Sequence, residues 1–224
     1  MVDNNEGATN EKTTVQTDGQ NKKVNQVWNL PNILTFSRIL IIPVFVALFY
    51  VHFTAHYFVC WALFAIACVT DLFDGAIARK HNLVTNLGKF LDPIADKVLV
   101  LTGFIMFLTV PQIFCANSSD WAIIVAGCGV AIIFARELIV SGFRMVAASS
   151  GEVIAADKIG KYKTFAQDLC VGFLIFAEGI IELTDNLFGV VVNLIGISLF
   201  ILSVILTVVS GVNYIAKNIQ VLKK

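Results

Sequence analysis

Hydrophobic and polar positions follow one another along this chain in long blocks rather than residue by residue. From Trp28 onward, apolar stretches of roughly 20 residues alternate with short polar segments, and roughly 20 residues is the length at which an α-helix crosses a bilayer. The pattern lacks the alternation over about ten residues that marks a membrane β-barrel, so helices must satisfy the backbone hydrogen bonds. We expect six membrane-spanning helices, at Asn32–Tyr50, Tyr57–Arg79, Leu87–Val110, Trp121–Ala148, Tyr162–Leu183 and Val190–Ala216.

Composition supports this reading. Hydrophobic residues make up 57% of the chain and charged residues 14%, against about 45–50% and about 25% in soluble domains. Residues 1–27 differ, because they are rich in Asn, Thr, Gln and Lys and hold too little apolar surface to form a core. We therefore predict a disordered tail at 1–27 and an all-α integral membrane domain at 28–224. The tail has no apolar stretch after a basic start, which argues against a signal peptide.

The basic residues predict the orientation. Segments 51–56, 111–120 and 184–189 contain no Lys or Arg, although the chain has 16 such residues. Loops on the cytoplasmic side of a membrane are enriched in Lys and Arg. Both termini are therefore expected in the cytoplasm, with these three segments outside. The net charge is zero, so total charge says nothing about partners.

Four aspartates lie where the second and third predicted spans meet the cytoplasm. Asp71 and Asp74 are three residues apart and Asp92 and Asp96 are four apart, so each pair shares one helix face. A short connection makes the two helices antiparallel, which lets all four carboxylates converge. Such a cluster repels itself unless it is neutralised, and two divalent cations, Mg²⁺ or Mn²⁺, suit hard oxygen ligands. The alternative is that these acids pair with basic residues at the helix ends, namely Arg79, Lys89 and Lys97.

Two glycines accompany the aspartates. Gly75 follows Asp74 directly, and Gly88 lies one helical turn before Asp92. They either allow close packing between helices or leave room for a bulky ligand near the backbone. Arg79 next to them offers a cation for a phosphorylated ligand.

Polar residues also occur on the first predicted helix. Asn32, Thr35 and Arg38 recur every third residue and share one face. They either mark a helix start, with Pro31 in the first turn, or face a ligand or partner inside the bundle.

A second group of cations belongs to the fourth and fifth predicted helices. Arg136 and Arg144 lie eight residues apart on one face, and Lys161 and Lys163 begin the next helix, together with Lys158. The cytoplasmic bias of basic residues explains some of them. Arg136, however, falls well inside its span, and a buried guanidinium needs an anion. That anion is either the neighbouring Glu137 or a substrate phosphate.

The aspartate pattern resembles a known signature. It reads Asp71-x-x-Asp74-Gly75-x-x-Ala78-Arg79, then, after eight residues, Gly88-x-x-x-Asp92-x-x-x-Asp96. This is similar to the motif of the CDP-alcohol phosphatidyltransferases at every position, and the likeness extends from about Asn29 to the C-terminus. It implies an enzyme that moves a phosphatidyl group from CDP-diacylglycerol to an alcohol and releases CMP. It also implies a six-helix membrane domain, usually a homodimer, with two metals in a cavity that faces the cytoplasm.

The resemblance implies a role for each residue of the motif. The metal ligands would be Asp71, Asp74, Asp92 and Asp96. Asp96 would also take the proton from the acceptor hydroxyl. The CDP-diacylglycerol pocket would be lined by Asn32, Thr35, Gly75, Ala78, Arg79 and Gly88.

Further stretches resemble the branch of this family that uses sn-glycerol 3-phosphate as acceptor. They are "NLPNILT" with Arg38, "LDPIADK", "ARE" and "GKYKT". The likeness implies phosphatidylglycerophosphate as the product. Residues expected at the acceptor phosphate are Arg38, Arg136, Arg144, Lys161 and Lys163. Phosphatidylglycerol or an inositol phosphate remains the alternative acceptor, because enzymes that use them share the core motif.

A divalent-cation transporter is the alternative from another class. Transporters are expected to place acids near the bilayer midplane, often between repeated halves. Here the acids gather near one face and no repeat is visible, which favours the enzyme. The expected location is the cytoplasmic membrane of a bacterium. Expected partners are the two substrates, membrane lipids and a second copy of the chain, with no nucleic acid.

Overall fold

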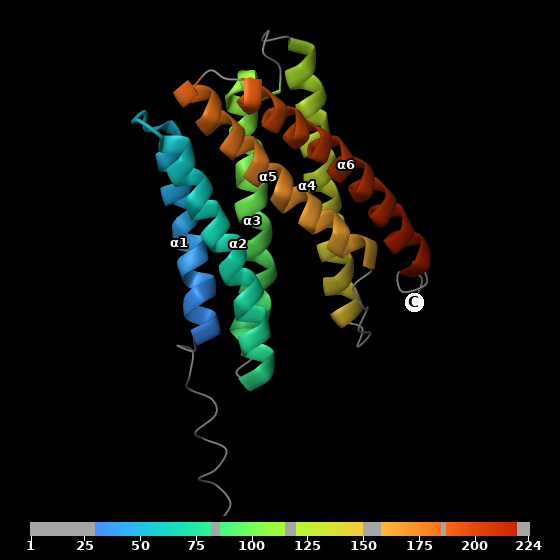
Figure 1. Cartoon of the computed structure of the whole chain (residues 1–224). Helices are drawn as coiled ribbons and strands as arrows, with labels where there is room; N and C mark the ends of the chain where they lie inside the picture. Colours follow the sequence, from blue (N-terminus) through green and yellow to red (C-terminus); the bar gives the residue numbers. More distant parts are fainter. Residues whose placement is uncertain (1–29, 82–85, 115–119, 150–157, 185–186, 219–224) are drawn as a thin grey trace, which may run out of the picture.

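The computed structural model describes residues 30–81, 86–114, 120–149, 158–184 and 187–218, and most of these residues are helical. Within these ranges there are six α-helices, one short 3-10 helix and no strand (Figure 1). The tail predicted at 1–27 lies outside the described residues. The elements are α1 (Leu30–Tyr50), α2 (His56–His81), α3 (Asn86–Thr109), η1 (Pro111–Ile113), α4 (Asp120–Ser149), α5 (Lys158–Thr184) and α6 (Leu187–Asn218).

Each predicted span coincides with one of these helices, which confirms the all-α prediction. The bounds agree closely except at α5, which begins at Lys158, before the first apolar residue of the predicted span. By length and composition, Trp121–Ala147, Ile159–Thr184 and Leu187–Asn218 can each cross a membrane. The described parts of the other helices hold the shorter apolar stretches Thr35–Tyr50, His56–Thr70 and Lys97–Thr109.

The helices pack as a bundle in which α3 and α5 join the two halves. Helices α1 and α2 pack on each other, α1 also packs on α3, and α6 packs on both α4 and α5 (Figure 1). Helix α3 contacts α4 and α5, while α5 also contacts α2. Gly196 lets α5 and α6 approach each other closely, because an added Cβ would lie only 2.6 Å from Cδ2 of Leu174. Small residues at such positions let membrane helices approach each other closely.

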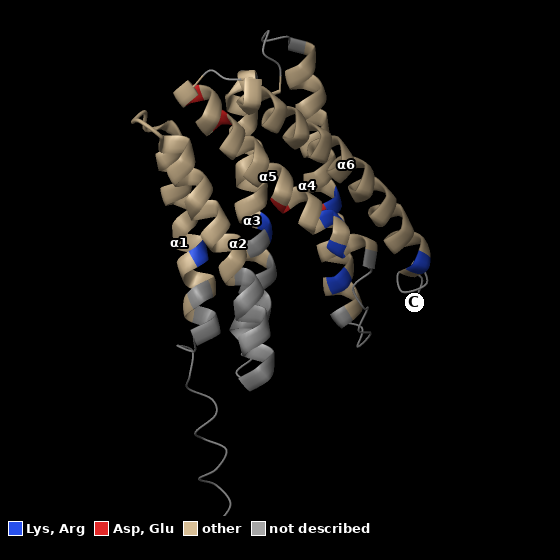
Figure 2. Ribbon diagram, viewed as in Figure 1, with Lys and Arg blue, Asp and Glu red and all other residues tan. Residues whose placement is uncertain are grey.

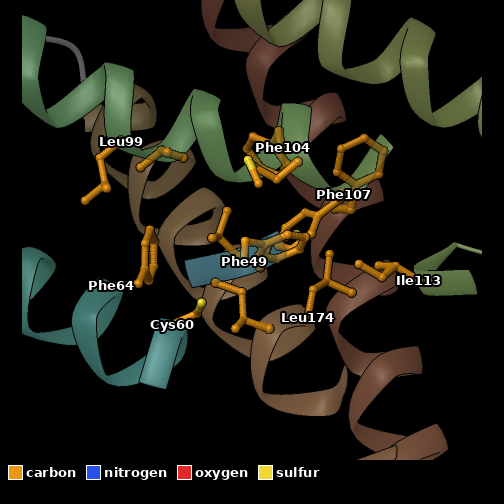
Figure 3. Packing of buried hydrophobic residues seen from close by; sticks show 14 of the residues in the cluster. Phe49, Cys60, Phe64, Leu99, Phe104, Phe107, Ile113 and Leu174 are labelled. Atoms are coloured by element: carbon orange, nitrogen blue, oxygen red, sulfur yellow. The ribbon is translucent and has the colours of Figure 1, made fainter. Parts of the chain in front are cut away.

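Aromatic side chains fill the centre of the bundle (Figure 3). Phe49 from α1 meets Phe107 from α3 with ring centroids 6.3 Å apart, and Phe104 lies 6.4 Å from Phe107. Figure 3 shows these rings pointing toward one another, with Leu174 of α5 beside them. Inside a membrane, such packing stabilises the bundle through van der Waals contact, because lipid is as apolar as the core.

The outer faces are apolar as well. On α6, for example, Leu194, Ile201 and Ile205 are each more than half exposed. Soluble monomers rarely expose large contiguous apolar surfaces. The exposed faces are therefore suited to contact with lipid, as the sequence predicts.

The two ends of the bundle differ in charge. Among the coloured residues, Lys and Arg occur on the side where α2 ends and α3 begins (Figure 2). At the opposite end, Nδ1 of the buried His56 lies 3.2 Å from Oε1 of Glu182. There Nδ2 of Asn193 also donates to Oε1 of Glu178 at 3.4 Å. These contacts join α2 to α5 and α5 to α6, far along the chain from the cations at the start of α5.

Candidate active site

The aspartate motif lies on two consecutive helices. Asp71 and Asp74 are in the second half of α2, and Asp92 and Asp96 are in the first half of α3. Only residues 82–85 separate the two helices, so His81 and Asn86 can be at most about 18 Å apart. Both aspartate pairs therefore lie toward the same end of the bundle.

The side chains of these aspartates lie outside the described part, so their role as metal ligands stays a prediction. Five of the residues expected at the nucleotide also lie outside the described part, and their role stays a prediction. They are Gly75, Ala78 and Arg79 on α2, Gly88 on α3 and Asn32 on α1. The donor set itself fits a divalent cation of the Mg²⁺ type, because all four side chains offer carboxylate oxygens.

Two predicted site residues on α1 are buried. Thr35 and Arg38 are each only 2% exposed. Helix α1 packs against α2 and α3, the helices that carry the motif. A fully buried guanidinium is rare without partners, so Thr35 and Arg38 belong to the interior of the bundle rather than to a frayed helix start.

Glu137 is the centre of a buried ionic cluster formed by three helices. Its Oε1 accepts a hydrogen bond from Nζ of Lys163 on α5 and lies 3.1 Å from Nη1 of Arg136. Its Oε2 lies 3.4 Å from Nζ of Lys97 on α3. The side chains of Glu137 and Lys163 are 7% and 3% exposed. Glu137 is therefore one anion that pairs with Arg136, which was one of the two alternatives that the sequence leaves open.

A small cavity of about 40 Å³ opens beside this cluster. It is lined by Lys97, Val100, Leu101, Ile133, Glu137, Lys163, Thr164 and Gln167. Gln167 is buried and its Nε2 donates to Oγ1 of Thr207 on α6 at 3.5 Å. The two lysines and the other hydrogen-bond donors of this lining are groups that bind an anion, and they lie beside the carboxylate of Glu137.

The structure separates the predicted acceptor residues into two sets. Arg136 and Lys163 meet at Glu137. Arg144 is exposed and its Nε donates to Oη of Tyr214 at 3.4 Å, with the guanidinium over the ring. Lys161 is exposed on the first turns of α5. Arg38, on α1, is not among the cations that contact Glu137.

Lys97 belongs to the Glu137 cluster, although the sequence does not predict it at the acceptor pocket. It directly follows Asp96, and from the sequence it is expected only as a partner for the aspartates. In the structure its Nζ contacts Glu137 and donates to Oγ of Ser141, 44 residues away. The sequence feature that could have identified Lys97 is its position at the end of "LDPIADK". Spacing along the chain, however, does not identify its partner on α4.

A second, larger cavity of about 510 Å³ lies between α2 and α5. Its walls are almost wholly apolar, with Asp168 as the exception. They comprise Trp61, Phe64, Ala65, Cys68, Val69, Phe165, Asp168, Leu169, Gly172, Phe173 and Phe176. The cavity reaches Val69, two residues before Asp71 on the same helix.

These features define a class: a helical membrane protein with a cluster of buried ionic side chains between α3, α4 and α5 and an apolar cavity between α2 and α5. The model of the CDP-alcohol phosphatidyltransferase family matches residues 28–212. The chain belongs to the CDP-alcohol phosphatidyltransferase family. That finding confirms the family resemblance seen in the aspartate motif.

Individual relatives agree with one another. A Bacillus subtilis protein named CDP-diacylglycerol–glycerol-3-phosphate 3-phosphatidyltransferase is 39% identical over 210 residues, covering 88% of this chain and 98% of that protein. A Rickettsia typhi protein of the same name is 41% identical over 161 residues, covering 69% of this chain and 82% of that protein. The Escherichia coli protein of that name is 37% identical over 155 residues, with 68% and 80% covered.

Proposed function

We propose that this chain transfers the phosphatidyl group of CDP-diacylglycerol to sn-glycerol 3-phosphate, giving phosphatidylglycerophosphate and CMP. The observation that carries the acceptor assignment is the convergence of Lys97, Arg136 and Lys163 on a buried point. Lys97 is the residue after Asp96, the proposed base, so the cationic pocket and the reacting hydroxyl can belong to one acceptor molecule. The names of the relatives support the same acceptor.

The proposed metal ligands are Asp71, Asp74, Asp92 and Asp96. Two divalent cations, Mg²⁺ or Mn²⁺, would neutralise the diphosphate of the lipid nucleotide and stabilise the CMP that leaves. Asp96 would accept the proton of the acceptor hydroxyl, which requires it to lie within hydrogen-bond reach of that oxygen.

The nucleotide of the lipid substrate is proposed to lie against α1, α2 and α3. Small residues on α2 and α3 would let it approach the backbone, while Thr35 on α1 would add a hydroxyl from a buried position. The full proposed set is Asn32, Thr35, Gly75, Ala78, Arg79 and Gly88.

The acceptor phosphate is proposed to bind at Arg136 and Lys163. A phosphate dianion must be kept apart from the aspartates, and charge-assisted hydrogen bonds from Lys and Arg are the strong contacts available for it. The family resemblance also implies Arg38, Arg144 and Lys161 at the same phosphate. Arg144 contacts Tyr214 and Lys161 is exposed. We therefore propose that these two residues attract the anion by their charge and do not form its closest contacts.

The large cavity between α2 and α5 is proposed to hold an acyl chain of CDP-diacylglycerol. Its volume of about 510 Å³ lies within the range of about 300–1,000 Å³ that is typical of ligand pockets. Its lining on α2 includes Val69, two residues before Asp71. An acyl chain bound in the cavity would therefore place the head group of the lipid near the aspartate motif.

We propose that the cation-rich end of the bundle faces the cytoplasm of a bacterium and that the chain lies in its inner membrane. The one-sided distribution of Lys and Arg supports this orientation (Figure 2). A homodimer is proposed by analogy with the family.

Acceptor selectivity tests the proposal. Purified protein is given CDP-diacylglycerol and, in separate reactions, glycerol 3-phosphate, myo-inositol 1-phosphate, serine or phosphatidylglycerol, and CMP release is measured. Glycerol 3-phosphate is expected to react fastest. A faster reaction with any other acceptor would overturn the acceptor assignment and leave family membership intact.

A further inference from the structure

The buried carboxylate of Glu137 contacts cations from its own helix and from two others. Lys97 reaches it from α3, Arg136 from α4 and Lys163 from α5. The proposed reaction assigns Glu137 no contact with either substrate. Its place in the cluster therefore needs a separate explanation.

Charge balance within the cluster is incomplete. Three cations face one carboxylate, which leaves two positive charges without a described counterion. Buried charges are normally paired. A phosphate monoester carries a charge of about −1.5 to −2 at neutral pH, so one acceptor phosphate would bring the cluster close to neutrality.

The hydrogen-bonding capacity of the cluster is incomplete as well. Nε of Arg136 is buried and has no hydrogen-bond partner among the described residues. The stem of this side chain packs against α6, because a Cβ added at Gly211 would lie 3.1 Å from Cγ of Arg136. The guanidinium therefore has one buried N–H that no described residue accepts.

We infer that Glu137 is the positioning residue of the acceptor site. Its carboxylate holds Lys97, Arg136 and Lys163 around one point, where their mutual repulsion would otherwise drive them apart. The acceptor phosphate then meets a preformed pocket, and Lys97 is thereby added to the cations of that pocket. This inference rests on the proposed acceptor.

Glu137→Gln tests the inference, because Gln keeps the shape of the side chain and removes its charge. The KM for glycerol 3-phosphate is expected to rise about tenfold or more, as for the loss of a well-ordered charged contact. The kcat at saturating acceptor and the KM for CDP-diacylglycerol are expected to stay within about twofold of the wild-type values. Such a change is much smaller than the tenfold rise expected for the acceptor. Inorganic phosphate, used as a competing probe, should inhibit the variant correspondingly less, and Glu137→Asp should restore part of the affinity.

Glu182→Gln is the matched control. It makes the same substitution at the opposite end of the bundle, where Oε1 of Glu182 lies 3.2 Å from Nδ1 of His56, and both KM values are expected to remain those of the wild type. If Glu137→Gln does not fold, Lys97→Met decides instead. Lys97 is 31% exposed on its side chain, so its loss disturbs the core less, and the KM for glycerol 3-phosphate should again rise selectively.

Three outcomes are informative. A selective rise in the KM for glycerol 3-phosphate supports the inference. An unchanged KM, or an equal loss for both substrates, overturns it. Absence of glycerol 3-phosphate-dependent CMP release by the wild type would instead refute the proposed function, so the two failures are distinguishable.

Discussion

Replacing Lys163 with Met removes one cation from the proposed phosphate pocket and keeps a side chain of similar length. Lys163 is 2% exposed and donates to Oε1 of Glu137. Glu137 still has Arg136 at 3.1 Å and Lys97 at 3.4 Å, so its carboxylate is not left alone. The loss of stability should therefore fall below the ~3–5 kcal/mol expected when a buried charge loses its only partner.

The effect on the acceptor should be larger than the effect on the fold. A charge-assisted hydrogen bond contributes about 1.5–3 kcal/mol, which corresponds to roughly a tenfold to hundredfold rise in the KM for glycerol 3-phosphate. The KM for CDP-diacylglycerol should change little. Lys161→Met, two residues away but exposed, should produce a smaller rise, because water already screens that charge.

The assay is CMP release by purified protein in detergent, with each substrate varied in turn. Thermal unfolding of the same samples separates loss of fold from loss of affinity. Lys217→Met, at the exposed last turn of α6, is the control for loss of a cation. A wild-type KM for glycerol 3-phosphate in Lys163→Met, or an equal rise in both KM values, would show that Lys163 does not bind the acceptor phosphate.

Three other predictions concern the metals, the base and the lipid. Excess chelator should abolish CMP release and added Mg²⁺ or Mn²⁺ should restore it, since four carboxylates need compensation; full turnover in chelator would contradict the metal assignment. Asp96→Asn should abolish turnover while CDP-diacylglycerol still binds, because Asn cannot accept the proton. Near-normal turnover of this variant would show that another group is the base. Asp71→Asn should instead raise the metal concentration needed for activity. Gly172→Leu should raise the KM for long-chain CDP-diacylglycerol but not for a short-chain analogue, because the larger side chain would enter the apolar cavity. There is room for the substitution, since an added Cβ has only Trp61 Nε1 near it, at 3.9 Å. Gly127→Leu is its control, as an added Cβ there meets nothing within 4 Å, and equal effects of the two substitutions would exclude the cavity as the acyl site.

The helices were predictable because a span needs a long apolar stretch whatever its neighbours are. The start of α5 shows the limit of that argument. The apolar stretch predicts a helix from Tyr162, yet α5 begins at Lys158. Apolarity marks the part of a helix that lies in lipid, and the helix continues through Lys158 and Lys161 beyond that part.

The sequence shows which polar residues share one helix face, but it does not show which partners they contact. Arg136 and Arg144 share a face, but eight residues of α-helix span about 12 Å. Their head groups can therefore meet different partners, as Glu137 and Tyr214 show. The contact of Lys97 with Ser141 depends on how α3 packs against α4, and spacing along one chain does not contain that information. The cavity between α2 and α5 depends on packing in the same way.

The most direct test of the proposed activity is the stoichiometry of the reaction. Purified protein is incubated with CDP-diacylglycerol, glycerol 3-phosphate and Mg²⁺, and CMP and phosphatidylglycerophosphate are both quantified. We predict equal amounts of the two products and no CMP release when glycerol 3-phosphate is omitted. Release of CMP at the same rate without the acceptor, or no release under any condition, would contradict the proposal.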